Sequence, residues 1–160
     1  MANELFLILH NIRSAYNVGA ILRTAEGAGV ARVYFSGYTP TPAEKNKIFI
    51  SLAQKMIAKT ALGAQEIVAW EKVESIEKLL EDLKKKKIKI IALEKVAGAT
   101  DLKDFKARFP MALFLGNEVE GVPREILDNS DEIISIPMRG KKESLNVSVA
   151  AGIAIYEILK

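Results

Sequence analysis

Short apolar runs alternate with amphipathic stretches along most of the chain. Runs rich in Leu, Ile, Val and Phe predict six strands, at residues 5–9, 32–35, 66–70, 88–93, 111–115 and 132–136. The clearest helix between them is 75–86, where a capping serine precedes an apolar face of Ile76, Leu79, Leu80 and Leu83. This alternation predicts an α/β fold, with a mostly parallel six-stranded sheet and helices on both faces.

The last predicted helix, 145–159, is apolar on two sides. One stripe contains Val147, Ala151, Ala154 and Ile158, and the other contains Val149, Ile153 and Tyr156. A surface helix packed on a sheet needs only one such stripe. A second subunit is the economical partner for the other stripe, so we expect a homodimer; a helix enclosed within one chain is the alternative.

The composition predicts a single domain and excludes disulfide-linked and zinc-binding proteins. With 160 residues and 49% hydrophobic composition, we expect a single domain over 1–160, without a separate RNA-binding extension. There is no cysteine and one histidine, which excludes disulfides and ordinary zinc sites. The absence of cysteine fits a reducing, cytoplasmic setting, and because no basic leader or run of about 18 apolar residues is present, we expect a soluble protein with no membrane partner. Residues 1–60 contain seven Lys or Arg and three Glu, and thus carry an excess of positive charge. This excess predicts either a face that binds RNA phosphates or an ordinary solvated surface.

The first polar block, 11–25, follows the first strand and passes into a helix. Asn17 is predicted to cap that helix, and Arg23 lies under two turns further along it. The neighbours Ala20, Ile21, Leu22 and Ala25 are apolar. An arginine in such a setting needs a carboxylate, a phosphate or open water.

The second block, 115–125, is a strand end followed by a loop between two glycines. Gly116 and Gly121 allow the backbone to approach a ligand closely, and Pro123 is suited to start a helix. Glu118 either orients a substrate or compensates a helix dipole. The block lacks the Lys-Ser/Thr of a phosphate-binding loop, and the glycines at 27–29 lack the spacing of a dinucleotide fingerprint.

The third block, 136–150, is a basic, glycine-containing loop that runs into the last helix. Ser144 is predicted to be the N-cap of this helix. Free amides in the first turn behind a cap form a positive, donor-rich end suited to a polar ligand.

In their order and position, the three blocks resemble the three motifs of the SpoU (TrmH-like) branch of the SPOUT RNA methyltransferases. The resemblance covers about residues 5–159. It implies a C-terminal trefoil knot, S-adenosylmethionine as methyl donor without a metal, and methylation of a ribose 2′-hydroxyl of tRNA or rRNA, with no DNA partner. By position it implies a cofactor site of Leu93, Gly116, Asn117, Ile136, Met138, Ser144 and Leu145. The catalytic and substrate-positioning set that it implies is Asn17, Arg23, Glu118, Ser144 and Asn146.

Arg23 is the residue that the resemblance implies as the activator of the ribose hydroxyl. A guanidinium with a pKa above about 12 is a reluctant base. We therefore favour a role in which it binds the adjacent phosphate and stabilises developing negative charge, with a phosphate-assisted base as the alternative. A non-catalytic RNA-binding or assembly factor with the same fold is the competing interpretation of the whole chain.

Overall fold

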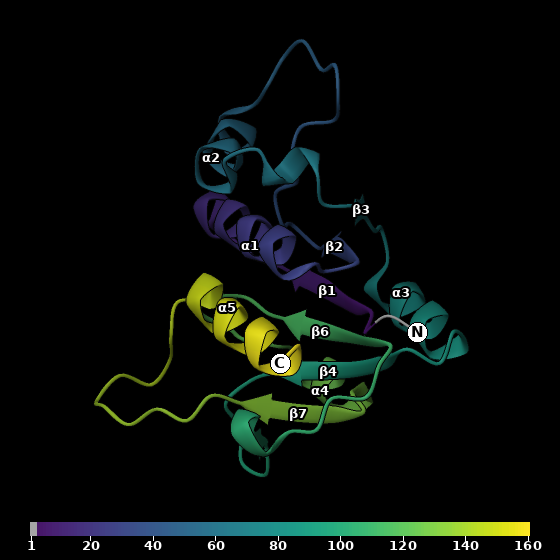
Figure 1. The fold of residues 1–160 in the computed structure, drawn as a ribbon, viewed down its shortest axis with the longest axis vertical. Coiled ribbons are helices and arrows are strands. Elements are labelled where there is room, and N and C mark those ends of the chain that lie inside the picture. The colour runs from purple at the N-terminus through teal and green to yellow at the C-terminus, as the bar shows by residue number, and fades with distance from the viewer. Residues whose placement is uncertain (1–2) are drawn as a thin grey trace.

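The computed structural model describes residues 3–160, and its centre is a parallel sheet (Figure 1). The strands are β1 (Leu5–His10), β2 (Arg32–Ser36), β3 (Trp70–Lys72), β4 (Lys89–Leu93), β5 (Thr100–Asp101), β6 (Met111–Leu115) and β7 (Glu132–Ser135). Their order in the sheet is β3-β2-β1-β6-β4-β7-β5, and every pairing is parallel. The predicted α/β class and parallel sheet are confirmed.

Two details of the predicted sheet are wrong. Residues 66–70 form the end of a 3₁₀ turn (η1, Ala64–Glu66) and the segment after it, and the strand begins only at Trp70. Within residues 3–160 the sheet also has seven strands rather than six, because Thr100 and Asp101 form the short edge strand β5, which pairs with β7. Two residues are too few to produce a periodic pattern.

Within the described part of the chain, five α-helices cover the two faces of the sheet. They are α1 (Ala15–Ala28), α2 (Leu52–Ala61), α3 (Ile76–Lys85), α4 (Arg124–Asn129) and α5 (Val147–Ile158), with a second 3₁₀ turn, η2 (Leu102–Asp104). Residues of α1, α2 and α5 share one buried cluster, and residues of α3 and α4 share another. No helix within residues 3–160 is long and apolar enough to cross a membrane.

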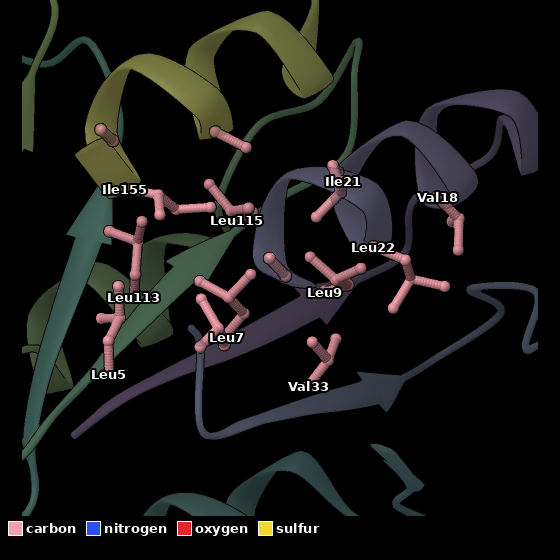
Figure 2. Close-up of a cluster of buried hydrophobic side chains, with 14 of the residues drawn as sticks. Leu5, Leu7, Leu9, Val18, Ile21, Leu22, Val33, Leu113, Leu115 and Ile155 are labelled. Atoms are coloured by element: carbon pink, nitrogen blue, oxygen red, sulfur yellow. The ribbon is translucent and has the colours of Figure 1, made fainter. Parts of the chain in front are cut away.

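Alternate residues of the central strands divide between the two cores. In β1, Leu7 belongs to the cluster under α1 and α5, whereas Ile8 belongs to the cluster under α3 and α4. Figure 2 shows Leu113 and Leu115 of β6 beside Ile155 of α5 in the first cluster. Both faces of β1 and β6 are therefore buried, which accounts for their nearly continuous apolar sequences.

Helix α1 begins earlier than its predicted cap. Ser14 is the N-cap, and its Oγ accepts a hydrogen bond from the Asn17 backbone N–H at 3.2 Å. Asn17 is the third residue of the helix, so its prediction as the cap was wrong. Serine and asparagine are both good caps, and the residue three positions upstream supplies the acceptor here.

Helix α5 begins later than predicted. Its N-cap is Asn146, whose Oδ1 accepts from the Ser148 and Val149 backbone amides, and the predicted cap Ser144 lies in the preceding loop. On this helix Ala151, Ala154, Ile155 and Ile158 are buried. The second apolar stripe, Val149, Ile153 and Tyr156, is exposed, so it is not enclosed within the described chain.

Candidate active site

The loops that follow β1, β2, β4, β6 and β7 meet at the carboxyl edge of the sheet, where ligands bind in open parallel folds. A cavity of about 440 Å³ lies among the loops that follow β4, β6 and β7. All seven residues of the implied cofactor site line it: Leu93, Gly116, Asn117, Ile136, Met138, Ser144 and Leu145. This volume lies within the range of small-molecule sites.

One wall of the cavity is the tight loop between Gly116 and Gly121. The Asn117 backbone N–H donates to the Gly121 carbonyl at 3.2 Å, and the Gly121 N–H donates back to the Asn117 carbonyl at 2.9 Å. A Cβ atom on Gly116 would lie 2.5 Å from the Gly121 oxygen, so only glycine fits there.

Glu94 holds the Gly121 end of this loop. Its Oε2 accepts from the Val122 backbone N–H at 2.8 Å, and Glu94 itself lines the cavity directly after β4. Sequence reasoning missed this residue, because an acid after a strand carries no pattern of its own.

The buried side chain of Asn117 forms four hydrogen bonds that hold the same loop in place. Its Nδ2 donates to the Asn11 carbonyl and to the Tyr38 hydroxyl, both at 2.9 Å. Its Oδ1 accepts from the Val119 and Glu120 backbone amides, both at 2.8 Å. These four bonds use both protons of the amide and both lone pairs of its oxygen. The Asn117 side chain therefore shapes the wall of the cavity from within the protein.

A second network joins the first helix to the same loop. Glu118 Oε2 accepts from the Arg13 backbone N–H at 2.9 Å, and Glu118 Oε1 accepts from the Ser14 N–H at 3.1 Å and from Asn17 Nδ2 at 3.3 Å. Asn17 Oδ1 accepts from Asn146 Nδ2 at 3.1 Å. Asn17, Glu118 and Asn146, which come from three separate blocks of sequence, thus form one chain of hydrogen bonds.

The electrostatics of Glu118 follow from these contacts. Partial burial raises the pKa of its carboxyl, but the hydrogen bonds from the Arg13 and Ser14 backbone and from Asn17 outweigh it. The net effect lowers the pKa of Glu118 below its ordinary value. Glu118 is therefore ionised at neutral pH and acts as an acceptor.

The other two members of the implied catalytic set lie outside that chain of bonds. Ser144 lines the cavity in the exposed loop before α5. Arg23 is exposed on α1, six residues after Asn17 and hence about 9 Å further along the helix. No carboxylate within residues 3–160 forms an ion pair with it.

His10 is the last residue of β1. Its Nδ1 lies 2.8 Å from Ser36 Oγ, and its Nε2 lies 3.3 Å from Asn11 Nδ2. Burial lowers the pKa of His10, which favours the neutral imidazole in this setting. Within the described residues, no three His, Asp or Glu side chains gather closely enough to hold a metal ion.

Comparison with known proteins identifies the family. The model of the SpoU rRNA Methylase family matches residues 4–156. The chain belongs to the SpoU family. It is 36% identical over 159 residues to the 23S rRNA (guanosine-2′-O-)-methyltransferase RlmB of Haemophilus influenzae, with 99% of this chain and 60% of that protein covered. The chain thus spans about three fifths of the length of this curated relative.

Solved structures agree with this SpoU assignment. The A. aeolicus TrmH/SpoU tRNA modifying enzyme superimposes with a TM-score of 0.80 at 31% identity, covering 99% of this chain and 75% of that one. The SpoU methyltransferase AviRb from Streptomyces viridochromogenes has the same fold, with a TM-score of 0.85 at 22% identity, covering 99% of this chain and 60% of that one.

Proposed function

We propose that this SpoU family chain is an S-adenosylmethionine-dependent RNA methyltransferase that modifies a ribose 2′-hydroxyl of tRNA or rRNA. The observation that carries the proposal is the position of the cavity beside the hydrogen-bonded chain of Asn17, Glu118 and Asn146. A relative from Haemophilus influenzae is named for guanosine-2′-O methylation of 23S rRNA, and one AviRb structure is titled as a complex with AdoMet.

The cavity suits the proposed cofactor. Leu93, Ile136, Met138 and Leu145 offer apolar surface to an adenine ring, while the backbone beside Gly116 is open to close approach. Ser144 adds a hydroxyl. When bound, S-adenosylmethionine supplies an electrophilic methyl group, and no metal is needed for that chemistry.

The protein's own task is to prepare the ribose oxygen. A ribose hydroxyl is a poor nucleophile at neutral pH, so its proton must pass to an acceptor, the adjacent phosphate or water, as the oxygen attacks. We assign Arg23 to binding the adjacent phosphate and stabilising the developing alkoxide. Its exposure and its lack of an ion pair within residues 3–160 leave the guanidinium available for that role. Glu118 and Asn146 are assigned to holding Asn17 and the substrate side of the cavity in place.

We further propose that the working form is a homodimer. The exposed stripe of Val149, Ile153 and Tyr156 on α5 supports this, because soluble monomers rarely leave such apolar surface uncovered. Ile153→Asp is expected to shift the dimer to a monomer in a dilution series followed by ultracentrifugation. A parent protein that stays monomeric at tens of micromolar would contradict the dimer. The C-terminal knot and a cytoplasmic location remain predictions.

The function is tested first by mapping ribose methylation of cellular tRNA and rRNA with and without the protein. Loss of a single 2′-O-methyl mark in its absence, restored by the purified protein with S-adenosylmethionine, is the expected result. RNA binding with no methyl transfer on either RNA class would instead favour the assembly factor.

Arg23→Lys tests the mechanism in the same assay. The lysine keeps the charge but cannot form two parallel donor bonds, so kcat should fall by about 10² or more. Cofactor binding, measured by calorimetry, should change little. Arg124→Lys makes the same exchange on α4 and serves as the control. Activity of Arg23→Lys within a few-fold of the parent would remove Arg23 from the mechanism.

A further inference from the structure

Tyr38 is exposed and yet firmly held at the rim of the active-site region. It lies in the turn after β2, and the residue is 58% exposed. Its backbone N–H donates to Asn11 Oδ1 at 3.1 Å, and its hydroxyl accepts from Asn117 Nδ2 at 2.9 Å. Gly37, at φ +62°, precedes it, and a Cβ there would collide with Asn11 Oδ1. Both ends of the tyrosine are therefore anchored while much of the residue faces solvent.

This anchoring has no evident role in core packing. Tyr38 belongs to neither buried cluster, in contrast to Tyr34 four residues earlier. Because its hydroxyl oxygen accepts from Asn117, the phenolic proton is available to a further acceptor, and none is found within residues 3–160. The tyrosine thus offers an aromatic face and one hydrogen-bond donor to a ligand.

Tyr38 is connected by hydrogen bonds to the loop that carries Glu118. The Asn117 side chain that holds its hydroxyl immediately precedes Glu118, whose carboxylate is bonded to the backbone of Arg13. Arg13 is exposed, and its guanidinium forms no ion pair within the described residues. Tyr38 and Arg13 are thus bonded to two adjacent residues, Asn117 and Glu118, and Arg13 follows two residues after Asn11, which also binds Tyr38. Unstacked nucleotides are bound by the combination of an aromatic ring and a guanidinium, through the flat face of the base and the charge of the phosphate.

We propose that Tyr38 forms a nucleobase-stacking site for an unstacked RNA nucleotide at or beside the methylated ribose. Asn117 is the positioning residue that fixes the orientation of the ring. The inference rests on the proposed RNA methyltransferase function and deepens it, because it requires the target to lie in a single-stranded or distorted segment of RNA.

The test separates stacking from anchoring with four substitutions of Tyr38. Trp and Phe retain an aromatic face, whereas Leu and Ala do not, and only the parent keeps the hydroxyl bonded to Asn117. The probe is the pool of tRNA and rRNA from cells that lack the protein. Stacking predicts that Tyr38→Leu and Tyr38→Ala weaken RNA affinity roughly 5- to 150-fold, while Tyr38→Phe and Tyr38→Trp stay within a few-fold of the parent.

Two assays separate RNA binding from the methyl-transfer step. Fluorescence anisotropy gives the RNA affinity, and the methyl-transfer assay gives the KM for RNA and kcat. S-adenosylmethionine affinity and Tm should stay close to the parent values in all four variants. Phe49→Ala is the control for the loss of an exposed aromatic side chain, because Phe49 is 85% exposed and does not line the cavity.

The results distinguish this inference from the proposed function. If Tyr38→Phe is as weak as Tyr38→Ala, the hydroxyl anchors the loop and stacking is wrong. Equal RNA affinity of Tyr38→Leu and the parent also overturns the stacking site. The same holds if Tyr38→Ala abolishes binding of another protein while RNA affinity is unchanged. A parent that binds RNA with the predicted ranking of variants but transfers no methyl group would contradict the proposed function and leave the stacking site supported.

Discussion

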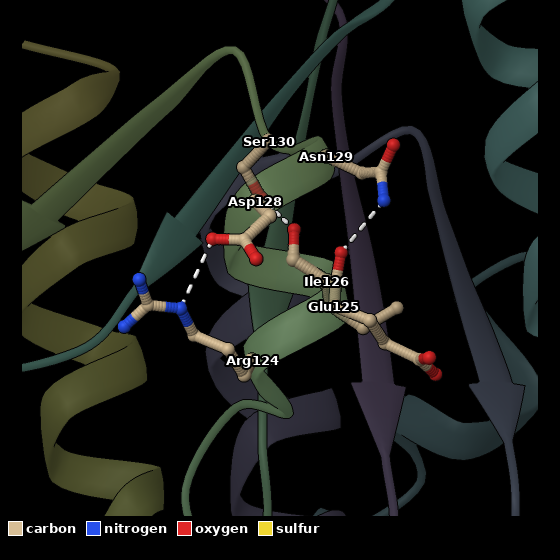
Figure 3. Close-up of polar contacts among 6 residues, drawn as sticks. All are labelled: Arg124, Glu125, Ile126, Asp128, Asn129 and Ser130. Carbon is tan, nitrogen blue, oxygen red and sulfur yellow. Dashed lines mark hydrogen bonds and ion pairs between the residues drawn. The ribbon is translucent and has the colours of Figure 1, made fainter.

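Two polar regions of this molecule differ in how far apart in sequence their partners lie. On α4 the contacts are all four residues apart: Arg124 with Asp128, Asn129 with the Glu125 carbonyl, and Ser130 with the Ile126 carbonyl (Figure 3). Around Glu118 the partners lie 101 to 105 residues away, and the Asn17–Asn146 bond spans 129 residues. The contacts on α4 join neighbouring residues of one helix, whereas those around Glu118 and Asn17 join three segments that are far apart in the sequence.

The physical consequence is a difference in what each contact controls. The Arg124–Asp128 pair has side chains 85% and 61% exposed, and exposed pairs of this kind contribute only a few tenths of a kcal/mol. Glu118 accepts bonds from two backbone amides that no helix or sheet satisfies. Disturbing Glu118 therefore moves the start of α1 relative to the loop after β6, where the proposed chemistry takes place.

Among substitutions in these two regions, Glu118→Gln should produce the largest effect. The neutral amide presents one oxygen where the carboxylate presents two, so the Arg13 and Ser14 amides cannot both be satisfied as before. We expect kcat for methyl transfer to fall by about 10². Glu120→Gln makes the same exchange on an exposed residue of the same loop, and it should retain the parent rate. Equal rates for both variants would show that the carboxylate network has no part in the reaction.

Asn117→Ala should cause the next largest effect, this time on stability. Removal of the amide leaves the Val119 and Glu120 backbone amides without their acceptor in a partly buried loop. The free energy of unfolding should fall by about 2–3 kcal/mol in urea titrations. The control is Asn129→Ala on α4, where one local bond to the Glu125 carbonyl is lost and a change under about 1 kcal/mol is expected. Comparable losses would contradict the distinction between the two regions.

Substitutions of Asn146 separate its two contacts. Asn146→Ala loses the cap of α5, and its free energy of unfolding should fall by about 1 kcal/mol. Asn146→Asp keeps an acceptor for the Ser148 and Val149 amides but loses the Nδ2 donor to Asn17. It should therefore retain stability in thermal melts and lose methyl-transfer activity. An active Asn146→Asp enzyme would confine this residue to capping.

The lowered pKa of Glu118 predicts a pH dependence of stability. Because the folded-state pKa lies below the ordinary value of 4.5, the stabilisation is present above pH 4.5 and is lost as the pH falls through the folded pKa. The Tm difference between the parent and Glu118→Gln should be largest near neutral pH and should shrink in acid. The effect should be modest, because this carboxyl is only partly buried. A difference that is constant from pH 7 to about pH 3 would contradict the assignment.

The strands and helices of the fold differ in how well the sequence predicts them. The alternation of apolar residues predicted β1, β2, β4, β6 and β7 and the helix α3, because burial on a face imposes a local period. It failed at 66–70, where a short apolar run after a helix is equally compatible with a turn, and at β5, which exists only through pairing with β7. The cap of α1 was misplaced because Ser14 and Asn17 both have capping side chains.

The candidate site was predictable in its residues but not in its connections. The resemblance to the SpoU family named Asn17, Glu118 and Asn146, yet only the topology of the sheet brings their side chains within hydrogen-bonding distance. Tyr38 gave no signal in the sequence, because it lies in a proline-rich loop and its anchor, Asn117, is 79 residues away. Long-range contacts leave no local period by which they could be found.

Asp128→Ala should give the smallest effect and tests the other side of the comparison. Its partner Arg124 keeps full access to water when the carboxylate is removed, so no buried charge is left behind. The free energy of unfolding should change by less than about 0.5 kcal/mol, and both kcat and RNA affinity should match the parent. Urea titration, the methyl-transfer assay and fluorescence anisotropy measure these three quantities on one preparation. A loss above about 1 kcal/mol, or a slower enzyme, would mean that the local contacts of α4 also support the site, and the contrast drawn between the two regions would fail.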